Sequence, residues 1–211
     1  MNLIISAHPD DEVLGCGGII AKENSVVLIL TNGSDDRYEK KIIKKHLNNA
    51  KKANEILGTK ELIIENFPNQ KLETIPLIKI TQTIEKYIKK FNPTKIFTHS
   101  RKDINLDHQI VARATFTATR TLPNTNVKEV YSYYIPSSSE WNFEECFCGD
   151  YFVDISDVID KKLEAMKCYD TELRDYPHPR SLKGVKVVSQ FFGIKAGFLN
   201  AEVFKLIRKI S

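Results

Sequence analysis

Short apolar runs alternate with helical patterns along most of this chain, and this alternation constrains the fold more than any other feature. The run Val26–Thr31 is almost entirely aliphatic, which is typical of a strand that is covered on both faces of a sheet. Similar runs are predicted as strands, and the amphipathic stretches between them as helices. The expected strands are Asn2–Ser6, Val26–Thr31, Leu62–Glu65, Lys95–Thr98 and Glu129–Ile135, and the expected helices are Arg37–Leu57, Ile75–Phe91, Asp107–Thr121 and Asp157–Tyr169.

Strands that alternate with helices predict an α/β fold of the Rossmann-like, doubly wound type, a mostly parallel sheet with helices on both faces. The 211 residues suffice for one domain, so we expect residues 1–211 to form a single domain. Ligands of such folds bind at the carboxyl ends of the strands, near the point where the strand order reverses. Two long irregular segments, Pro136–Gly149 and Arg174–Gly184, are expected to carry function.

Composition and charge exclude several classes of partner. The net charge of +4 is small, and no run of Lys and Arg is interleaved with aromatic residues, so no nucleic-acid binding is expected. No apolar stretch approaches membrane-spanning length, so no membrane insertion is expected. No basic leader precedes the first strand, and the four cysteines fit no zinc-finger spacing. We therefore expect a cytoplasmic protein with reduced thiols, although Cys146 and Cys148 could chelate a soft metal; a homo-oligomer is compatible with the sequence.

Histidine and carboxylate side chains follow two of the predicted strands. His8, Asp10 and Asp11 come after the first strand, and His99 and His108 after the fourth. Crowded carboxylates repel one another unless a cation lies among them. Imidazole and carboxylate ligands around an open position are how proteins hold catalytic zinc. A single histidine would be explained as a hydrogen-bonded turn residue, but the joint pattern favours a metal site.

The glycine-rich stretch Gly15–Gly18 allows a different interpretation, a phosphate-binding loop at a helix start. It lacks the glycine spacing of dinucleotide-binding loops. The neighbouring carboxylates of Asp10, Asp11 and Glu12 would also repel a pyrophosphate. We expect these glycines to let the helix pack tightly on the sheet, and Glu12 to serve as a first-turn carboxylate favoured by the helix dipole.

Two motifs, Ala7-His8-Pro9-Asp10-Asp11-Glu12 and Asp107-His108, resemble those of the LmbE-like (PIG-L) metal-dependent N-deacetylases. The similarity extends to Leu30–Gly33, Phe97–Ser100 and Tyr176–Ser181. The resemblance implies a Rossmann-like fold, one Zn²⁺ per chain and removal of acetyl from an N-acetylglucosamine-type glycoside or sugar nucleotide. The products would be acetate and an amino sugar. Fe²⁺ is a second candidate because a His/His/Asp ligand set suits several divalent metals.

Carried over by position, the resemblance implies that His8, Asp11 and His108 are the metal ligands and Asp10 the general base. Asp107 would be a catalytic supporting group that orients the loop. His8 and Asp11 share a tight turn, so both can reach one ion. A carboxylate that lies beside the ion without binding it suits a proton acceptor.

The chain departs from the family pattern at the expected oxyanion donor. Many members carry a histidine three residues before the ligating one, where this chain has Asn105. Asparagine can donate a hydrogen bond but carries no positive charge. His99 and His178 are alternative donors and candidate substrate contacts. For His99 the competing interpretation is a strand-end residue bonded to backbone.

The expected sugar contacts also differ from the family pattern. His46 stands where an arginine is common in the family, so a sugar-contacting arginine is absent or replaced by Arg37. Arg180 is a candidate contact for a phosphate or carboxylate on the substrate, and Trp141 for stacking on a sugar ring.

Three functions are therefore carried forward. The first is a zinc-dependent hydrolase that deacetylates a small N-acetylated sugar. The second is a zinc hydrolase of another small amide. The third, which the acidic turn disfavours, is a non-catalytic nucleotide or sugar-nucleotide binding module.

Overall fold

A seven-stranded sheet forms the centre of the computed structural model, which describes residues 1–33, 40–121 and 125–211. Its order is β3-β2-β1-β4-β5-β7-β6. Strands β1 to β5 pair in parallel, whereas β7 runs antiparallel to both β5 and β6. The strands are β1 (Asn2–Ser6), β2 (Ser25–Thr31), β3 (Glu61–Phe67), β4 (Lys95–Thr98), β5 (Glu129–Tyr133), β6 (Tyr151–Asp154) and β7 (Ala201–Lys209). The predicted α/β fold with a mostly parallel sheet is confirmed.

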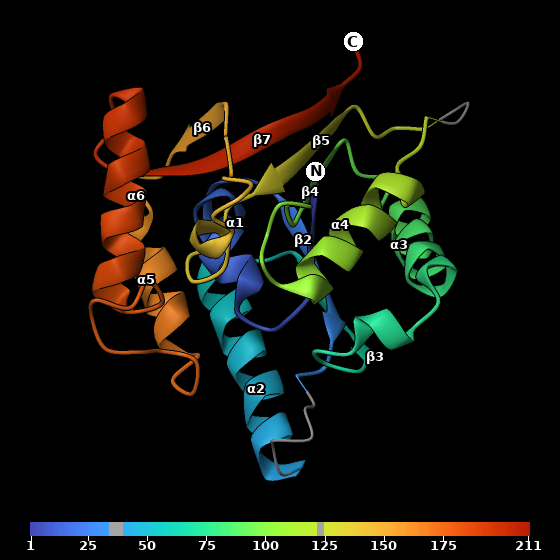
Figure 1. The fold of residues 1–211 in the computed structure, drawn as a ribbon, viewed down its shortest axis with the longest axis horizontal. Coiled ribbons are helices and arrows are strands. Elements are labelled where there is room, and N and C mark those ends of the chain that lie inside the picture. Colours follow the sequence, from blue (N-terminus) through green and yellow to red (C-terminus); the bar gives the residue numbers. More distant parts are fainter. Residues whose placement is uncertain (34–39, 122–124) are drawn as a thin grey trace.

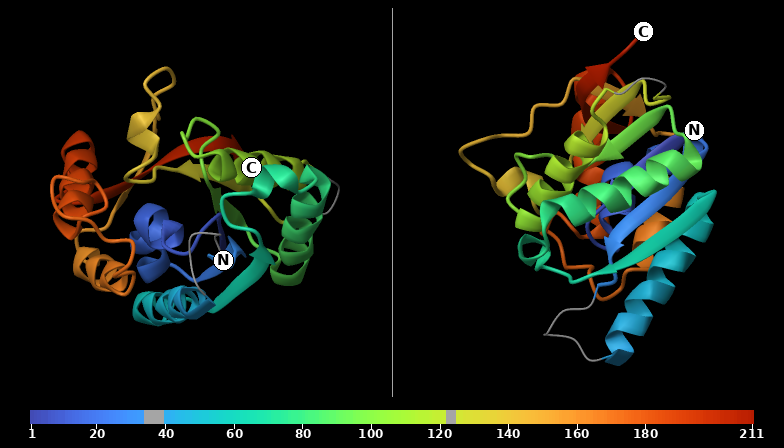
Figure 2. Two further views of the ribbon diagram at one scale, coloured as in Figure 1. Left: turned by 60° about the horizontal axis from the view of Figure 1, so that its bottom comes forward. Right: turned by 90° about the vertical axis from the view of Figure 1, so that its right-hand side faces the viewer.

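Helices cover both faces of this sheet (Figures 1 and 2). One apolar cluster joins the sheet to α1, α2 and α5, and a second joins the opposite face to α3 and α4. The helices are α1 (Asp11–Lys22), α2 (Lys40–Leu57), α3 (Leu77–Phe91), α4 (Leu106–Ala118), α5 (Ile159–Lys167) and α6 (Leu182–Ala196), with 3-10 turns η1 (Leu72–Thr74) and η2 (Ser139–Trp141). None of the helices among the described residues is long and apolar enough to cross a membrane.

The C-terminal third holds the elements that the sequence patterns do not predict: β6, α6 and β7. Helix α6 exposes Val187, Phe191 and Ile194 to solvent, so its apolar residues do not mark a single buried face. Helix α5 starts at Ile159, later than predicted. Its N-cap residue is Val158, and the preceding Ser156 donates to the Asp154 carboxylate.

Strand order reverses beside β1, which lies between β2 and β4. The β1–β4 register pairs Ile4 with Phe97, so the two strands end at the same edge of the sheet. This edge brings His8 and His99 close together in space. The reversal of strand order thus places the polar clusters where the fold class predicts a ligand.

The glycines of α1 allow a close approach between this helix and its neighbours. A Cβ on Gly18 would lie 2.3 Å from the Ile155 Cγ2 atom, and one on Gly15 would lie 2.5 Å from the Tyr133 ring. Both distances are shorter than carbon atoms tolerate. The expectation that these glycines serve helix packing is confirmed.

Candidate metal centre and active site

The turn between β1 and α1 is held in a conformation that few side chains adopt. Asp10 has φ 112°, outside the regions that L-residues favour. Its backbone N–H donates to Glu12 Oε2 at 3.1 Å, and Glu12 Oε1 accepts from Tyr169 Oη (2.5 Å) and Asn54 Nδ2 (2.9 Å). Burial raises the pKa of Glu12 to about 7. Glu12 therefore does more than face the helix dipole, because it anchors the turn.

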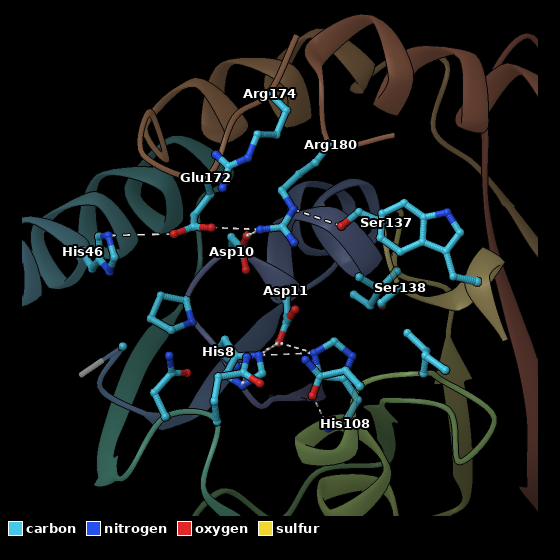
Figure 3. Close-up of a pocket in the computed structure, with 18 of the residues that line it drawn as sticks. His8, Asp10, Asp11, His46, His108, Ser137, Ser138, Glu172, Arg174 and Arg180 are labelled. Carbon is cyan, nitrogen blue, oxygen red and sulfur yellow. Dashed lines mark hydrogen bonds and ion pairs between the residues drawn. The ribbon is translucent and has the colours of Figure 1, made fainter. Parts of the chain in front are cut away.

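Three buried side-chain atoms form a nearly equilateral triangle beside this turn (Figure 3). Asp11 Oδ2 lies 3.3 Å from both His8 Nδ1 and His108 Nε2, and the two nitrogens are 3.2 Å apart. A tetrahedral zinc ion has ligands at about 2.0–2.1 Å, which puts the ligand atoms about 3.3 Å from one another. These three residues can therefore hold a metal ion of that size, with one coordination position left open.

A second carboxylate lies behind each of the two imidazoles. Asp107 Oδ2 accepts from His8 Nε2 at 2.9 Å, so the His8 proton sits on Nε2 and Nδ1 is available to a metal. Asp103 Oδ1 lies 3.1 Å from His108 Nδ1, which directs Nε2 to the site. Asp107 is itself fixed by the backbone N–H groups of Gln70 (2.8 Å) and Leu72 (3.0 Å). Asp107 therefore lies outside the triangle, where its carboxylate holds the His8 ring in this orientation.

The charges in the triangle are strongly coupled. Burial acts to raise the pKa of Asp11, but the surrounding histidines hold it well below its usual range. Burial acts to lower the pKa of His108, but the carboxylates of Asp11 and Asp103 raise it to about 10. A proton on His108 thus balances these carboxylates, as a metal cation would.

Asp10 has a different partner, which lies outside the triangle. Its Oδ2 atom lies 3.4 Å from Arg180 Nη1 (Figure 3). The same guanidinium bonds Glu172 Oε2 at 2.9 Å and Ser137 Oγ at 3.0 Å. Burial raises the pKa of Asp10 well above its usual value, while Arg180 acts to lower it. Asp10 is therefore a carboxylate that adjoins the ligands without belonging to them.

The triangle and Asp10 line a cavity of about 650 Å³, a size that admits a sugar. Trp141, Ile104, Ile135 and Pro9 contribute its apolar part, and Lys71, Arg174 and Arg180 contribute cations. The wall is otherwise mostly polar. The cavity therefore suits a small hydrophilic ligand with one apolar face.

Among the predicted oxyanion donors, Asn105 lines the cavity and His99 does not. Asn105 Oδ1 caps α4 by accepting from the backbone N–H groups of Asp107 (2.9 Å) and His108 (3.4 Å). Its Nδ2 has no hydrogen-bond partner within the described residues, so this amide can donate into the cavity.

His99 is fully buried behind the candidate metal ligands. Its Nε2 accepts from Ala7 N at 2.8 Å, and its ring stacks on His108 at 3.9 Å. Burial and the nearby His108 lower the pKa of His99 to about 4. Of the two interpretations of His99, the structure favours a strand-end residue bonded to backbone, because no part of it reaches the cavity.

Of the other predicted substrate contacts, one lines the cavity and one does not. Arg180 lines the cavity, but it is engaged by Asp10 and Glu172. His178 is absent from the lining; its Nδ1 accepts from the Arg180 backbone N–H at 3.1 Å, and its ring packs against Trp141. Arg37 lies outside the described residues.

Glu172 and Asp103 lie in the site, although the sequence analysis assigned neither of them a role. Glu172 lies between α5 and α6, and no local pattern links it to Arg180. Asp103 accepts hydrogen bonds from the hydroxyls of Ser138 and Ser139, and it also faces His108. Its place in the series Asp103-x-Asn105-x-Asp107-His108, at a strand end, was the available signal.

Similarity to known proteins identifies the family. Residues 3–119 match the family model PIG-L, described as GlcNAc-PI de-N-acetylase. The chain belongs to the PIG-L family. It is therefore a deacetylase, a hydrolase, with a His/Asp site that can hold a metal.

Individual relatives of this PIG-L chain are distant. It is 25% identical to the diacetylchitobiose deacetylase of Thermococcus kodakarensis, over 97% of this chain and 82% of the relative. It is also 25% identical to a probable N-acetyl-alpha-D-glucosaminyl L-malate deacetylase 2 of Bacillus cereus, over 81% of this chain and 82% of the relative. The structure of the N,N'-diacetylchitobiose deacetylase from Pyrococcus horikoshii superposes with a TM-score of 0.80 at 20% identity, covering 98% of this chain and 83% of that one. At this low identity, the structural similarity shows a shared fold only.

Proposed function

We propose that this protein removes the acetyl group from a small N-acetylated sugar, using a divalent metal held by His8, Asp11 and His108. The observation that carries the proposal is the triangle of ligand atoms, 3.2–3.3 Å apart, beside a carboxylate that takes no part in it. Zn²⁺ is the metal proposed first because two imidazoles and one carboxylate with an open position suit catalytic zinc. Fe²⁺ is the alternative.

A bound metal would polarise the acetamide carbonyl and make a water molecule more acidic. Asp10 takes the proton of the attacking water and returns it to the nitrogen that leaves as the amine. Arg180 keeps the Asp10 carboxylate in position and favours its charged form. Asn105 Nδ2 donates to the oxygen that becomes negative during the attack. Water and amide are thereby converted into acetate and a free amine.

The proposal of a sugar substrate is supported by the cavity and by the relatives. The wall is mostly polar, and Trp141 offers one aromatic face of the kind on which sugar rings stack. Relatives that match over four-fifths or more of this chain are described as deacetylases of N-acetylglucosamine-containing compounds. A small amide without a sugar is the second candidate, because the ligand triangle would serve either reaction.

The experiment is an assay of released amine by fluorescamine, paired with acetate quantification, on protein loaded with zinc or iron. The panel contains N-acetylglucosamine, its disaccharide, a nucleotide-linked N-acetyl sugar and N-acetyl amino acids. We expect equal amounts of amine and acetate from a sugar, loss of activity with a chelator and recovery with metal. Turnover of the amino acids alone would contradict the sugar assignment, and full activity without metal would contradict the metal centre.

Asp10→Asn tests the proposed proton acceptor separately. We expect it to keep its metal content and lose roughly 10²–10⁴-fold in kcat, the usual contribution of a general base. Asp160→Asn, which changes an exposed carboxylate on α5, is the matched control. Wild-type turnover by the Asp10 variant would exclude this role.

A further inference from the structure

A second cavity, of about 430 Å³, lies apart from the metal centre, where β7 extends the sheet beyond β5. The turn after β4, helix α4, the two strands and the segment 145–148 line it. Gly149 lets that segment lie close to β7, because a Cβ there would be 2.2 Å from Val203 Cγ2. The backbone N–H of Asp150 then bonds Phe204 O at 2.9 Å. The close approach at Gly149 and this backbone bond thus hold one wall of the cavity against β7.

The charges that line this cavity are mainly positive. Arg101, Lys102 and Lys205 contribute three cations, against the single carboxylate of Glu145 among the described lining residues. Lys205 is paired with Asp150 at 2.6 Å. Arg101 and Lys102 are exposed, and neither has an ion-pair partner in the part of the chain that the structure describes. Clustered cations of this kind attract oxyanions.

Ser132 adds an independent indication of a ligand. This residue is 2% exposed and lines the cavity from β5, opposite Lys205 in the β5–β7 register. Its Oγ has no hydrogen-bond partner among the described residues. Buried hydroxyls normally have a partner, since an unsatisfied one costs about 1–3 kcal/mol. The described protein atoms thus leave a buried hydroxyl unsatisfied in a residue of the cavity wall.

Apolar side chains form another part of the wall. Phe116, Phe147 and Ile207 line the cavity beside the cations, and Ile207 is 44% exposed. The volume lies within the usual range for small-molecule sites. We propose that this cavity binds a small molecule in which a phosphate or carboxylate is attached to a flat apolar group. The site is separate from the metal centre and does not depend on the proposed deacetylation.

The test uses Cys148, an exposed thiol on the cavity wall. Metal-loaded protein is alkylated with iodoacetamide, and the modification of each cysteine is followed by peptide mass spectrometry. The probes are phenyl phosphate, benzoate, inorganic phosphate and uncharged benzyl alcohol. We expect an anionic aromatic probe to slow Cys148 alkylation several-fold and saturably, with Cys168 on the other side of the sheet unaffected. Phenyl phosphate against benzoate distinguishes the two oxyanions, and an anion held at the metal centre would not protect Cys148.

Variants make the outcome decisive. Arg101→Ala/Lys102→Ala should raise the half-protecting probe concentration at least tenfold, and Ser132→Ala should raise it less. Arg113→Ala, which removes an exposed arginine of α4 that lines neither cavity, should leave it unchanged. The proposal is overturned if no anionic probe protects Cys148, if benzyl alcohol protects equally, or if protection survives in the double variant.

Discussion

Asp10 and Asp11 are adjacent residues of identical chemistry that the structure places in opposite surroundings. The positive φ of Asp10 turns its carboxylate toward Arg180, while Asp11 faces three imidazoles. Burial raises the pKa of Asp10, whereas the pKa of Asp11 is held well below its usual range by the histidines around it. One carboxylate is therefore suited to accept a proton and the other to bind a cation.

Metal binding should compete with protons at His108. Its pKa, raised to about 10, means that the imidazole is protonated at neutral pH in the metal-free protein. A metal must displace that proton, so zinc affinity should fall as the pH is lowered below about 10. Calorimetric titrations of metal-free protein with Zn²⁺, in buffers of different ionisation enthalpy, should show release of about one proton or more. Heats that are independent of the buffer would contradict this expectation, and His108→Ala should release fewer protons than the native chain.

The carboxylate behind His108 should tune metal affinity without binding the metal itself. Asp103→Asn keeps the size of the side chain but removes the charge that orients and polarises His108. We expect roughly 10–100-fold weaker zinc binding, the usual effect of losing such a partner. Competition with a chromophoric chelator measures the affinity, and circular dichroism checks the fold. Glu73→Gln, at an exposed carboxylate of η1, should leave affinity unchanged; equal losses in both variants would exclude a specific role for Asp103.

At the scale of single elements, α1 and α4 supply the site through their first turns. Helix α1 begins at Asp11, directly after the Asp10 turn, and α4 begins beside Asn105, whose side chain caps it. Asparagine is among the best N-cap residues, so its presence at this position stabilises the helix that carries His108. The same residue lines the cavity, and its Nδ2 has no hydrogen-bond partner among the described residues.

Replacing Gly18 tests whether close packing of α1 supports the site. The Cβ of Gly18→Ala would overlap Ile155, so we expect destabilisation of about 1–3 kcal/mol despite the better helix propensity of alanine. Gly17→Ala is the matched control. Its Cβ would meet only the Lys162 side chain, at 3.0 Å, and it should cost less. Urea unfolding of both variants measures the difference, and a Gly18 variant as stable as the Gly17 variant would refute the packing argument.

Across the whole molecule, residues from the last third of the chain hold the first helix in place. Lys162 of α5 pairs with Glu202 of β7 at 2.7 Å, and both side chains are buried. Lys162 also donates to Leu14 O at 2.8 Å, and Glu202 accepts from the backbone N–H groups of Gly18 (2.6 Å) and Ile19 (2.9 Å). The C-terminal elements thereby fix the helix that follows the Asp10 turn.

Replacing one member of this ion pair should lower the free energy of unfolding more than replacing both. Lys162→Met leaves the Glu202 charge buried without its partner, and we expect a loss of about 3–5 kcal/mol in unfolding free energy. Lys162→Met/Glu202→Gln should recover part of the loss, since no uncompensated charge remains. Denaturant unfolding measures both. A single variant as stable as the native chain would show that the pair does not anchor α1.

The sequence by itself determined the parallel half of the sheet and the place of the candidate metal site. Continuous apolar runs specify buried strands locally, and the His8–Asp11 turn and His108 lie just beyond strand ends that must meet at one edge. Helix and strand boundaries needed only small corrections there. The division of roles between Asp10 and Asp11 came from the resemblance of the motif and stays a proposal.

Only the tertiary structure decided which distant side chains surround that cluster. Arg180 meets Asp10 across 170 residues of sequence, and Glu202 meets Gly18 across 184. The tertiary structure also places His99 behind the candidate ligands and bonds His178 to the backbone of Arg180. It adds β6 and β7 to the sheet as well. Such contacts leave no local periodicity, because they depend on which surfaces remain uncovered once the parallel strands and their helices have packed.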